Sequence, residues 1–317
     1  MSGIYDISGN EISDVSYLCT RPEDYGAVGD GVTDDAVAIQ QAVNNAGWIL
    51  FATGKTYRVA STIRVKKNTI IDLNGATIDC ATGHLFYNFA SGATTGGYTG
   101  NGDILIKNGK IVGGAISFIH GKDIRFENVC FYNSLNDHFM EICACKNFVL
   151  DGCLFSGMTY LTTSVMEYIN IDPCYFGPFP WNQNNESFYD GTINNGITIQ
   201  NCTFELGEGS YSNGYNAIGV HVSDGSQHQN IKIINNKISG FTGCGLRINN
   251  MNDVVIANNV IELTASGANG IRVGDVSRST KVVIKGNIIT SNGTAITKSS
   301  NSTVLQSSDN EINPTYS

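Results

Sequence analysis

The stretch VVIANNVI, residues 254–261, carries apolar side chains at 254, 256 and 261 around a pair of asparagines. Apolar residues two positions apart are typical of a half-buried strand. An Asn or Gly after them suits a corner in the left-handed backbone conformation. The same pattern recurs in IIDLNGATI (70–78), ILIKNGKI (104–111), IRFENVCF (124–131), FVLDGCLF (148–155), ITIQNCTF (197–204), IKIINNKI (231–238) and VVIKGNII (282–289). Each copy predicts two short strands joined by a tight corner.

The spacing of these copies predicts a solenoid. Counted from Ile71, their starting positions are separated by 33, 20, 24, 49, 34, 23 and 28 residues. Steps of this size, with one strand pattern in each, indicate stacked coils with loops of variable length. The step of 49 residues is either two coils or one coil with a long insertion. Charged residues make up only 15% of the chain and glycines number 36, which also favours an all-β chain with many turns.

A second strand is predicted ahead of the repeated pattern. It reads FMEIC (139–143), VMEYI (165–169), AIGVHV (217–222), GLRIN (245–249) and GIRVG (270–274). If the apolar residues face the core, the outward residues form a ladder on one sheet, with successive coils about 4.8 Å apart. The predicted ladder consists of Glu141, Glu167, Gly219 with His221, Arg247 and Arg272.

The N-terminal part has a different pattern. Residues 24–47, DYGAVGDGVTDDAVAIQQAVNNAG, predict an amphipathic helix over about 33–46, with Thr33 or Asp34 as its N-cap. Such a helix can cover the open end of a solenoid. We therefore expect an N-terminal extension over residues 1–22 and one β-helix domain over 23–317. An aromatic insertion is expected at about 173–195.

Composition disfavours several classes of function. The formal net charge of −9 disfavours a nucleic-acid partner, which needs clustered basic residues. No apolar run is long enough for a membrane helix, so no membrane partner is expected. The N-terminus has no apolar core of a signal peptide, which indicates synthesis in the cytoplasm without one. The nine cysteines lack framework spacing and are interpreted mostly as buried free thiols. No metal or other cofactor is predicted.

The segment DYGAVGDGVTDDAVAIQQAV, followed by ILFATGKTYRV, resembles the entry segment of the pectate-lyase-like superfamily. With the repeats, the resemblance spans nearly the whole chain and implies a single-stranded right-handed parallel β-helix. The superfamily includes polygalacturonases, other polysaccharide hydrolases, lyases, epimerases and phage tailspike depolymerases. It therefore implies a polysaccharide as partner and action outside the cell, with a phage virion component as one possibility. A tailspike would be a homotrimer, and otherwise a monomer is expected.

Three shorter pieces resemble motifs of the polygalacturonases. They are Asn170-Ile171-Asp172, Gly219-Val220-His221 and Arg247-Ile248-Asn249. The Asp-Asp pair of that family has no counterpart here, and Asn249 stands where that family has a lysine.

Hydrolysis of a glycosidic bond needs a protonated acid and a second carboxylate. Glu141 and Glu167 are predicted to lie on neighbouring coils, about 5 Å apart at the backbone, with Asp172 as a third acid. His221 is predicted to assist proton transfer. Arg247 is included among the catalytic candidates because it follows on the same face.

Substrate contacts are predicted around these acids. Arg272, with Arg247, could hold an anionic group on a sugar through bidentate contacts. Asp137 and His138 precede Glu141 at the edge of the same coil. Trp181, in the aromatic insertion, could stack on a sugar ring.

Two other functions fit the same residues. A lyase or epimerase would use Arg247 or His221 to abstract the C5 proton of a uronate, with Arg272 neutralising its carboxylate. A non-catalytic glycan-binding tail protein would keep the fold alone. For each acid taken singly, a solvated residue on a strand is the simpler interpretation.

Overall fold

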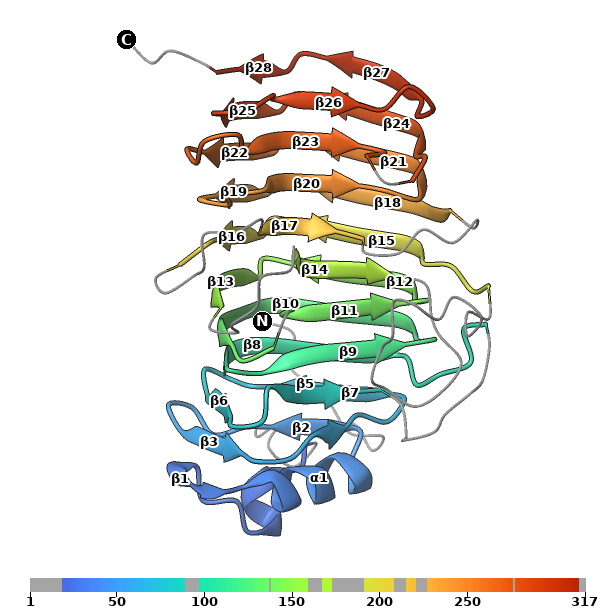
Figure 1. Ribbon diagram of the computed structural model, residues 1–317. Helices are drawn as coiled ribbons and strands as arrows, with labels where there is room; N and C mark the ends of the chain where they lie inside the picture. The colour runs from blue at the N-terminus through green and yellow to red at the C-terminus, as the bar shows by residue number, and fades with distance from the viewer. Residues whose placement is uncertain are drawn as a thin grey trace, which may run out of the picture.

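The computed structural model describes residues 19–88, 97–136, 138–158, 167–172, 191–207, 215–220, 227–275 and 277–313. The chain winds into a right-handed parallel β-helix, and the strands of successive coils stack in parallel (Figure 1). Among the described residues, no helix is long and apolar enough to cross a bilayer. The predicted all-β solenoid is confirmed.

The strands form two sheets. The nine-stranded sheet consists of β4 (Ile63–Arg64), β7 (His84–Tyr87), β9 (Ala115–Ile119), β11 (Met140–Cys143), β14 (Glu167–Asp172), β17 (Asn216–Gly219), β20 (Cys244–Ile248), β23 (Asn269–Val273) and β26 (Ile296–Lys298). The 19-stranded sheet consists of β1 (Asp30–Asp34), β2 (Trp48–Leu50), β3 (Thr56–Val59), β5 (Thr69–Asp72), β6 (Thr77–Cys80), β8 (Ile104–Val112), β10 (Lys122–Ser134), β12 (Lys146–Asp151), β13 (Leu154–Met158), β15 (Asn195–Gln200), β16 (Thr203–Glu205), β18 (His228–Ile234), β19 (Lys237–Ser239), β21 (Met251–Ala257), β22 (Val260–Leu263), β24 (Thr280–Lys285), β25 (Ile288–Ser291), β27 (Val304–Ser308) and β28 (Glu311–Ile312).

The register between coils reproduces the predicted spacing. Directly paired residues are Ile104 with Ile124, Ile124 with Phe148, and Phe148 with Ile197, which are steps of 20, 24 and 49. The following steps of 34, 23 and 28 are also observed. The long step is therefore one coil with an insertion. Only the first step differs: Ile71 pairs with Ile106, a step of 35, not 33.

Each repeat turns its corner at a residue with positive φ, as predicted. Asn108, Asn128, Asn201, Asn235 and Asn258 have φ between 54° and 60°. Glycines take the same place in two repeats, with φ of 65° and 63°. Left-handed backbone is costly for residues other than Gly and, to a smaller extent, Asn. This requirement explains why the repeats carry those two residues there.

The residue after each corner points inward and builds a ladder. In four coils it is an asparagine: Asn236, Asn259, Asn287 and Asn310. The Oδ1 of Asn259 accepts from the backbone N–H of Asn236 at 2.9 Å, and its Nδ2 donates to the carbonyl of Ile233 at 2.9 Å. The other rungs repeat these bonds. The ladder satisfies backbone groups that would otherwise be buried without partners.

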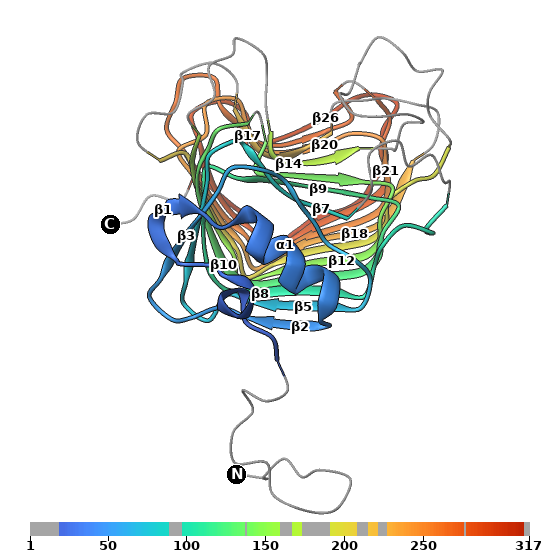
Figure 2. The same ribbon diagram turned by 90° about the horizontal axis from the view of Figure 1, so that it is seen from below.

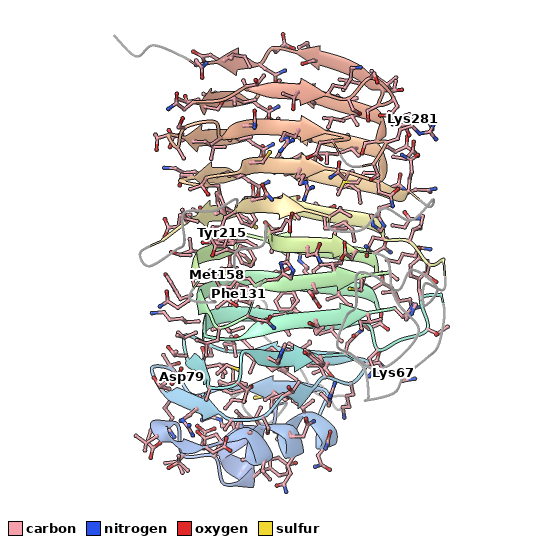
Figure 3. The ribbon with its side chains drawn as sticks, viewed as in Figure 1. Lys67, Asp79, Phe131, Met158, Tyr215 and Lys281 are labelled. Carbon is pink, nitrogen blue, oxygen red and sulfur yellow. The ribbon has the colours of Figure 1, made fainter. Side chains whose placement is uncertain are left out.

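Aromatic side chains also stack because the repeat places them in register. The rings of Phe131, Phe155 and Phe204 lie 4.8 and 4.9 Å apart and are nearly parallel. In Figure 3, Phe131 lies within the solenoid, whereas Lys281 points out from its edge. The core is therefore a column of matching apolar residues.

The N-terminal end of the solenoid is covered by the helix α1 (Ala36–Asn45), after the 3₁₀ turn η2 (Pro22–Tyr25) (Figure 2). The helix buries five apolar residues toward the coils. The predicted N-cap was wrong: the residue before the helix is Asp35, whose carboxylate accepts from the N–H groups of Val28 and Gly29. Thr20 already pairs with Ile49, three residues before the expected start of the domain.

The cysteines follow the prediction where they are described. Free thiols are carried by Cys80, Cys130, Cys145, Cys153, Cys202 and Cys244, and all but Cys130 are buried. Burial raises the pKa of Cys145 to about 12, so its metal-binding thiolate form is disfavoured.

A second corner joins the nine-stranded sheet to the start of the next strands. Asn194 is its central residue. Its side chain accepts from the N–H of Cys145 at 2.7 Å and donates to the carbonyls of Ile142 and Asp172 at 3.0 and 2.8 Å. Its own N–H donates to Nδ1 of the buried His228 at 3.0 Å. This corner therefore fixes the ends of β11 and β14.

Replacing a ladder rung should destabilise the protein. The substitution Asn259→Ala leaves the N–H of Asn236 and the carbonyl of Ile233 buried without these partners. We expect a loss of about 2–5 kcal/mol in the free energy of unfolding, measured with urea. The control is Asn258→Gly at the neighbouring exposed position, where glycine accepts the positive φ and the change should stay within about 1 kcal/mol. Equal effects of both variants would contradict the ladder's role.

Stability should also depend on the protonation of His228. Burial lowers the pKa of His228 to about 4. Between about pH 6.5 and pH 4, the unfolded chain binds a proton that the folded chain does not, so stability falls as the pH falls. The loss reaches about 3 kcal/mol near pH 4. The variant His228→Asn should lose less stability than the wild type between pH 7.5 and pH 4.5. Equal losses would show that His228 does not carry this dependence.

Candidate functional site

The outward face of the nine-stranded sheet carries one continuous row of polar residues. Strand pairing aligns Tyr87 with Ser117, Ser117 with Glu141, and Glu141 with Asn170. Asn170 aligns with Gly219, and Arg247 with Arg272 and then Thr297. The strands β11, β14, β17, β20 and β23 lie side by side in this order (Figure 1). Of the predicted ladder, four members fall in this row, namely Glu141, Gly219, Arg247 and Arg272. Glu167 does not fall in it, and His221 lies outside the described residues.

The misplaced member is Glu167. It pairs with Asn216, and Asn170 is the residue that pairs with Glu141. Glu141 and Glu167 lie on neighbouring coils, as predicted, but the predicted direct alignment, about 5 Å apart at the backbone, is wrong. Both glutamates follow a methionine, which suggested a common register. In the structure Ile169 and Ile171 align with the inward residues Met140 and Ile142, and this shifts Glu167 by three positions.

Glu141 and Asp172 are diagonal neighbours on the same face. Asp172 stands two residues beyond Asn170, the residue paired with Glu141. Nδ2 of Asn170 donates to Oδ2 of Asp172 at 2.9 Å, and Oγ of Ser117 donates to Oε2 of Glu141 at 3.2 Å. Asp172 is buried and Glu141 is half-buried. Each carboxylate is therefore held by a neutral hydrogen-bond donor from the same face.

Glu167 is instead bound into an ion pair that bridges two coils. Nη1 of Arg247 lies 3.3 Å from Oε1 of Glu167, and Nδ2 of Asn216 donates to the same oxygen at 3.1 Å. The strand between the partners carries Gly219. A Cβ atom on Gly219 would meet Cγ of Glu167 at 2.4 Å. The absence of a side chain at residue 219 therefore makes room for the buried carboxylate.

Asp275 completes this charged network. It accepts from Nε of Arg247 at 3.4 Å and lies 3.1 Å from Nη2 of Arg272. The strand pattern of the sequence does not reveal Asp275, because this residue follows the end of β23. An acid three residues after the ladder position Arg272, close enough to pair back onto the arginines, is the signal that could have identified it.

His138 is buried, and its Nδ1 donates to the carbonyl of Glu167 at 2.6 Å. The hydroxyl of Ser134 donates to the carbonyl of His138 at 3.0 Å. These contacts join β10 to β14 and favour a positioning role for His138. Its predicted role as a substrate contact stays a prediction.

Three predicted site residues lie outside the described residues: Asp137, His221 and Trp181. Most of the aromatic insertion lies outside them as well. In the described ranges, no three His, Cys, Asp or Glu side chains gather into a metal-ligand set.

Enlarging Gly219 should break the bridge between Glu167 and Arg247. The variant Gly219→Ala places its methyl group on the Glu167 side chain, and we expect a loss of about 2–4 kcal/mol in unfolding free energy. Gly47 is the matched control, because its Cβ would meet only a carbonyl oxygen at 3.4 Å. A loss in Gly219→Ala no larger than in Gly47→Ala would contradict the steric argument.

A family model described as rhamnogalacturonase A/epimerase, pectate lyase-like, matches residues 22–143. A curated relative is the plasmin and fibronectin-binding protein A of Streptococcus pneumoniae, 30% identical over 290 residues. The match covers 77% of this chain and 39% of that relative. A second relative is the K30/K69-specific capsule depolymerase of Klebsiella phage K64-1, 42% identical over 57 residues. That match covers 17% of this chain and 7% of the depolymerase. The chain thus spans well under half of either relative's length.

Solved structures show the same fold. PfbA, a surface adhesin of Streptococcus pneumoniae, superposes with a TM-score of 0.74 at 25% identity, covering 93% of this chain and 77% of that one. The tailspike of Escherichia coli bacteriophage HK620, solved with a hexasaccharide, has a TM-score of 0.66 at 13% identity. It covers 92% of this chain and 55% of the tailspike. The coiled architecture, the family model and the PfbA structure fit the pectate-lyase-like superfamily of right-handed β-helices.

Proposed function

We propose that this chain degrades a polysaccharide by hydrolysing a glycosidic bond on the outward face of the nine-stranded sheet. The observation that carries the proposal is the diagonal arrangement of Glu141 and Asp172 on adjacent strands. Two carboxyl groups on one face are the minimum for this reaction. The depolymerase relative and the family model support a carbohydrate substrate.

The hydrogen-bond partners suggest different roles for the two acids. The amide of Asn170 can only donate toward Asp172 through Nδ2, which favours the ionised carboxylate. The hydroxyl of Ser117 can donate to an ionised Glu141 or accept from a protonated one. Glu141 is therefore assigned as the general acid, and Asp172 as the base that activates water.

The separation of the acids favours inversion at the anomeric carbon. One coil step of about 4.8 Å and two residues of about 3.3 Å each put their Cα atoms about 8 Å apart. Side chains that leave one sheet face in parallel keep roughly that separation. Inverting glycosidases have carboxyl groups about 6.5–9.5 Å apart, and retaining ones about 5–5.5 Å.

Arg247 fits a positioning role better than that of a base. Its guanidinium carries a positive charge and lies between the carboxylates of Glu167 and Asp275. A lyase that uses Arg247 to abstract a proton would have to remove that charge. The arrangement therefore supports hydrolysis more than elimination.

Non-catalytic binding is the second candidate. The plasmin and fibronectin-binding protein A of Streptococcus pneumoniae is named for binding those two proteins, and it matches more of this chain than the depolymerase does. The same face would then bind a surface glycan or protein without cleaving it. Because the relatives include a surface adhesin and phage tailspikes, both candidates act outside the cell or on a virion. A homotrimer is proposed only if the protein is a tailspike.

The test is the release of reducing ends from a panel of bacterial and plant polysaccharides. The variants Glu141→Gln and Asp172→Asn should each lower the rate at least about 100-fold. Glu262→Gln, at an exposed position of β22 on the other sheet, should keep the wild-type rate. Proton NMR of the first product should show an inverted anomer.

Specific outcomes would reject the proposal. Unchanged cleavage in both carboxyl variants would exclude this acid pair. Products that absorb in the ultraviolet as unsaturated uronides would favour a lyase. Binding of a glycan that stays intact would favour the adhesin-like function.

A further inference from the structure

We propose that Arg272, supported by Asp275 and Thr297, forms a subsite for an anionic substituent of the glycan, such as a carboxylate or sulfate. The inference rests on the proposed function to the extent that the outward face binds a glycan. It adds the charge of the substrate and the place of that charge relative to the bond that is cut.

The two arginines of the network differ in how much of the guanidinium is available. The Arg247 side chain is 17% exposed and has acids on two sides, Glu167 and Asp275. The Arg272 side chain is 39% exposed, and among the described residues its one ion pair joins Nη2 to Asp275. A guanidinium has five N–H donors in a planar fork, and a pair of them matches a carboxylate or sulfate. Arg272 is therefore the arginine that can bind a ligand.

Asp275 is a positioning residue for Arg272. It lies within 3.4 Å of Arg247 and 3.1 Å of Arg272, so it ties both guanidinium groups to one carboxylate. Its side chain is only 18% exposed. Holding a long side chain in one geometry lowers the entropy that is lost when a ligand binds. Asp275 therefore holds the guanidinium of Arg272 in a fixed geometry before the ligand binds.

The next coil adds one group beside Arg272. Thr297 pairs directly with Arg272, so a hydroxyl stands one coil further along the same row. An anion at this end of the face is thus met by the Arg272 guanidinium and the Thr297 hydroxyl.

The acids at the other end restrict where the anion can bind. Asp172, the proposed base, lies on β14, and its ionised carboxylate repels an anion placed beside it. Arg272 lies on β23, three coils beyond β14, which is about 14 Å at the usual strand spacing. The anionic sugar therefore lies more than one unit away from the cleaved bond, and the sugar at the acids is neutral.

The test measures binding in the Glu141→Gln background, so that cleavage does not interfere. Affinity electrophoresis is run with polygalacturonate, its carboxyl-reduced form and dextran sulfate, which separate a carboxylate, a neutral sugar and a sulfate. Arg272→Gln should weaken binding to at least one anionic polymer about tenfold or more, with Arg272→Lys in between. Asp275→Asn should weaken binding of the same anionic polymer and leave any binding of the carboxyl-reduced polymer unchanged.

Arg125 provides a matched control. It lies on β10 in the other sheet, its side chain is 42% exposed, and it also pairs with acids. Arg125→Gln should bind every polymer as the parent does. The selective loss in Arg272→Gln should also shrink at high salt, because exposed charges are screened.

The failure of this inference can be told apart from that of the proposed function. If the protein cleaves a polymer, and Arg272→Gln and Arg125→Gln change the binding of that polymer equally, the subsite is wrong. The proposal of hydrolysis is not affected by that result. Selective loss in Arg272→Gln without cleavage by the wild type would support the subsite and reject hydrolysis. Absence of binding to both anionic polymers would overturn the subsite.

Discussion

The hydrogen bonding between successive coils is the constraint on which the rest of this molecule depends. Each corner places one residue at positive φ and the next one inward, where Asn side chains bond to the backbone of the neighbouring coil. This keeps the coils in parallel register despite steps that range from 20 to 49 residues. The outward residues of the nine-stranded sheet are then spaced by the strand separation alone. Loops can vary without moving the site.

The site gains its geometry from a shift within that register. Glu167 falls three positions before the residue aligned with Glu141, so it is removed from the row of the candidate acids. It pairs with Arg247 across the strand of Gly219 and becomes part of the scaffold. The acids that remain on the face are Glu141 and Asp172. The two candidate acids therefore lie at one end of the face, and the arginines with their paired carboxylates lie at the other.

The fold could be predicted from the sequence because its determinants are local. The alternation of apolar residues and the Asn or Gly corner appear in every repeat, and six of the seven steps are found in the structure. The register of the nine-stranded sheet could not be predicted as well. Its strands are short and lack the corner motif, so the Met-Glu pairs at 140–141 and 166–167 suggested an alignment that the isoleucines of β14 override. Asp275 was missed because contacts beyond a strand end depend on the fold, and Asp137, Trp181 and His221 remain predictions from the sequence.

The proposed binding and the proposed hydrolysis share one face, so the central claim concerns where a glycan lies. The most direct test is a crystal structure of the Glu141→Gln variant with a bound oligosaccharide. The account predicts a chain along the outward face of the nine-stranded sheet, with a glycosidic oxygen within hydrogen-bonding distance of residue 141. It also predicts a water between Asp172 and the anomeric carbon. A glycan bound to the 19-stranded sheet, or one on the predicted face that contacts neither residue 141 nor Asp172, would contradict it.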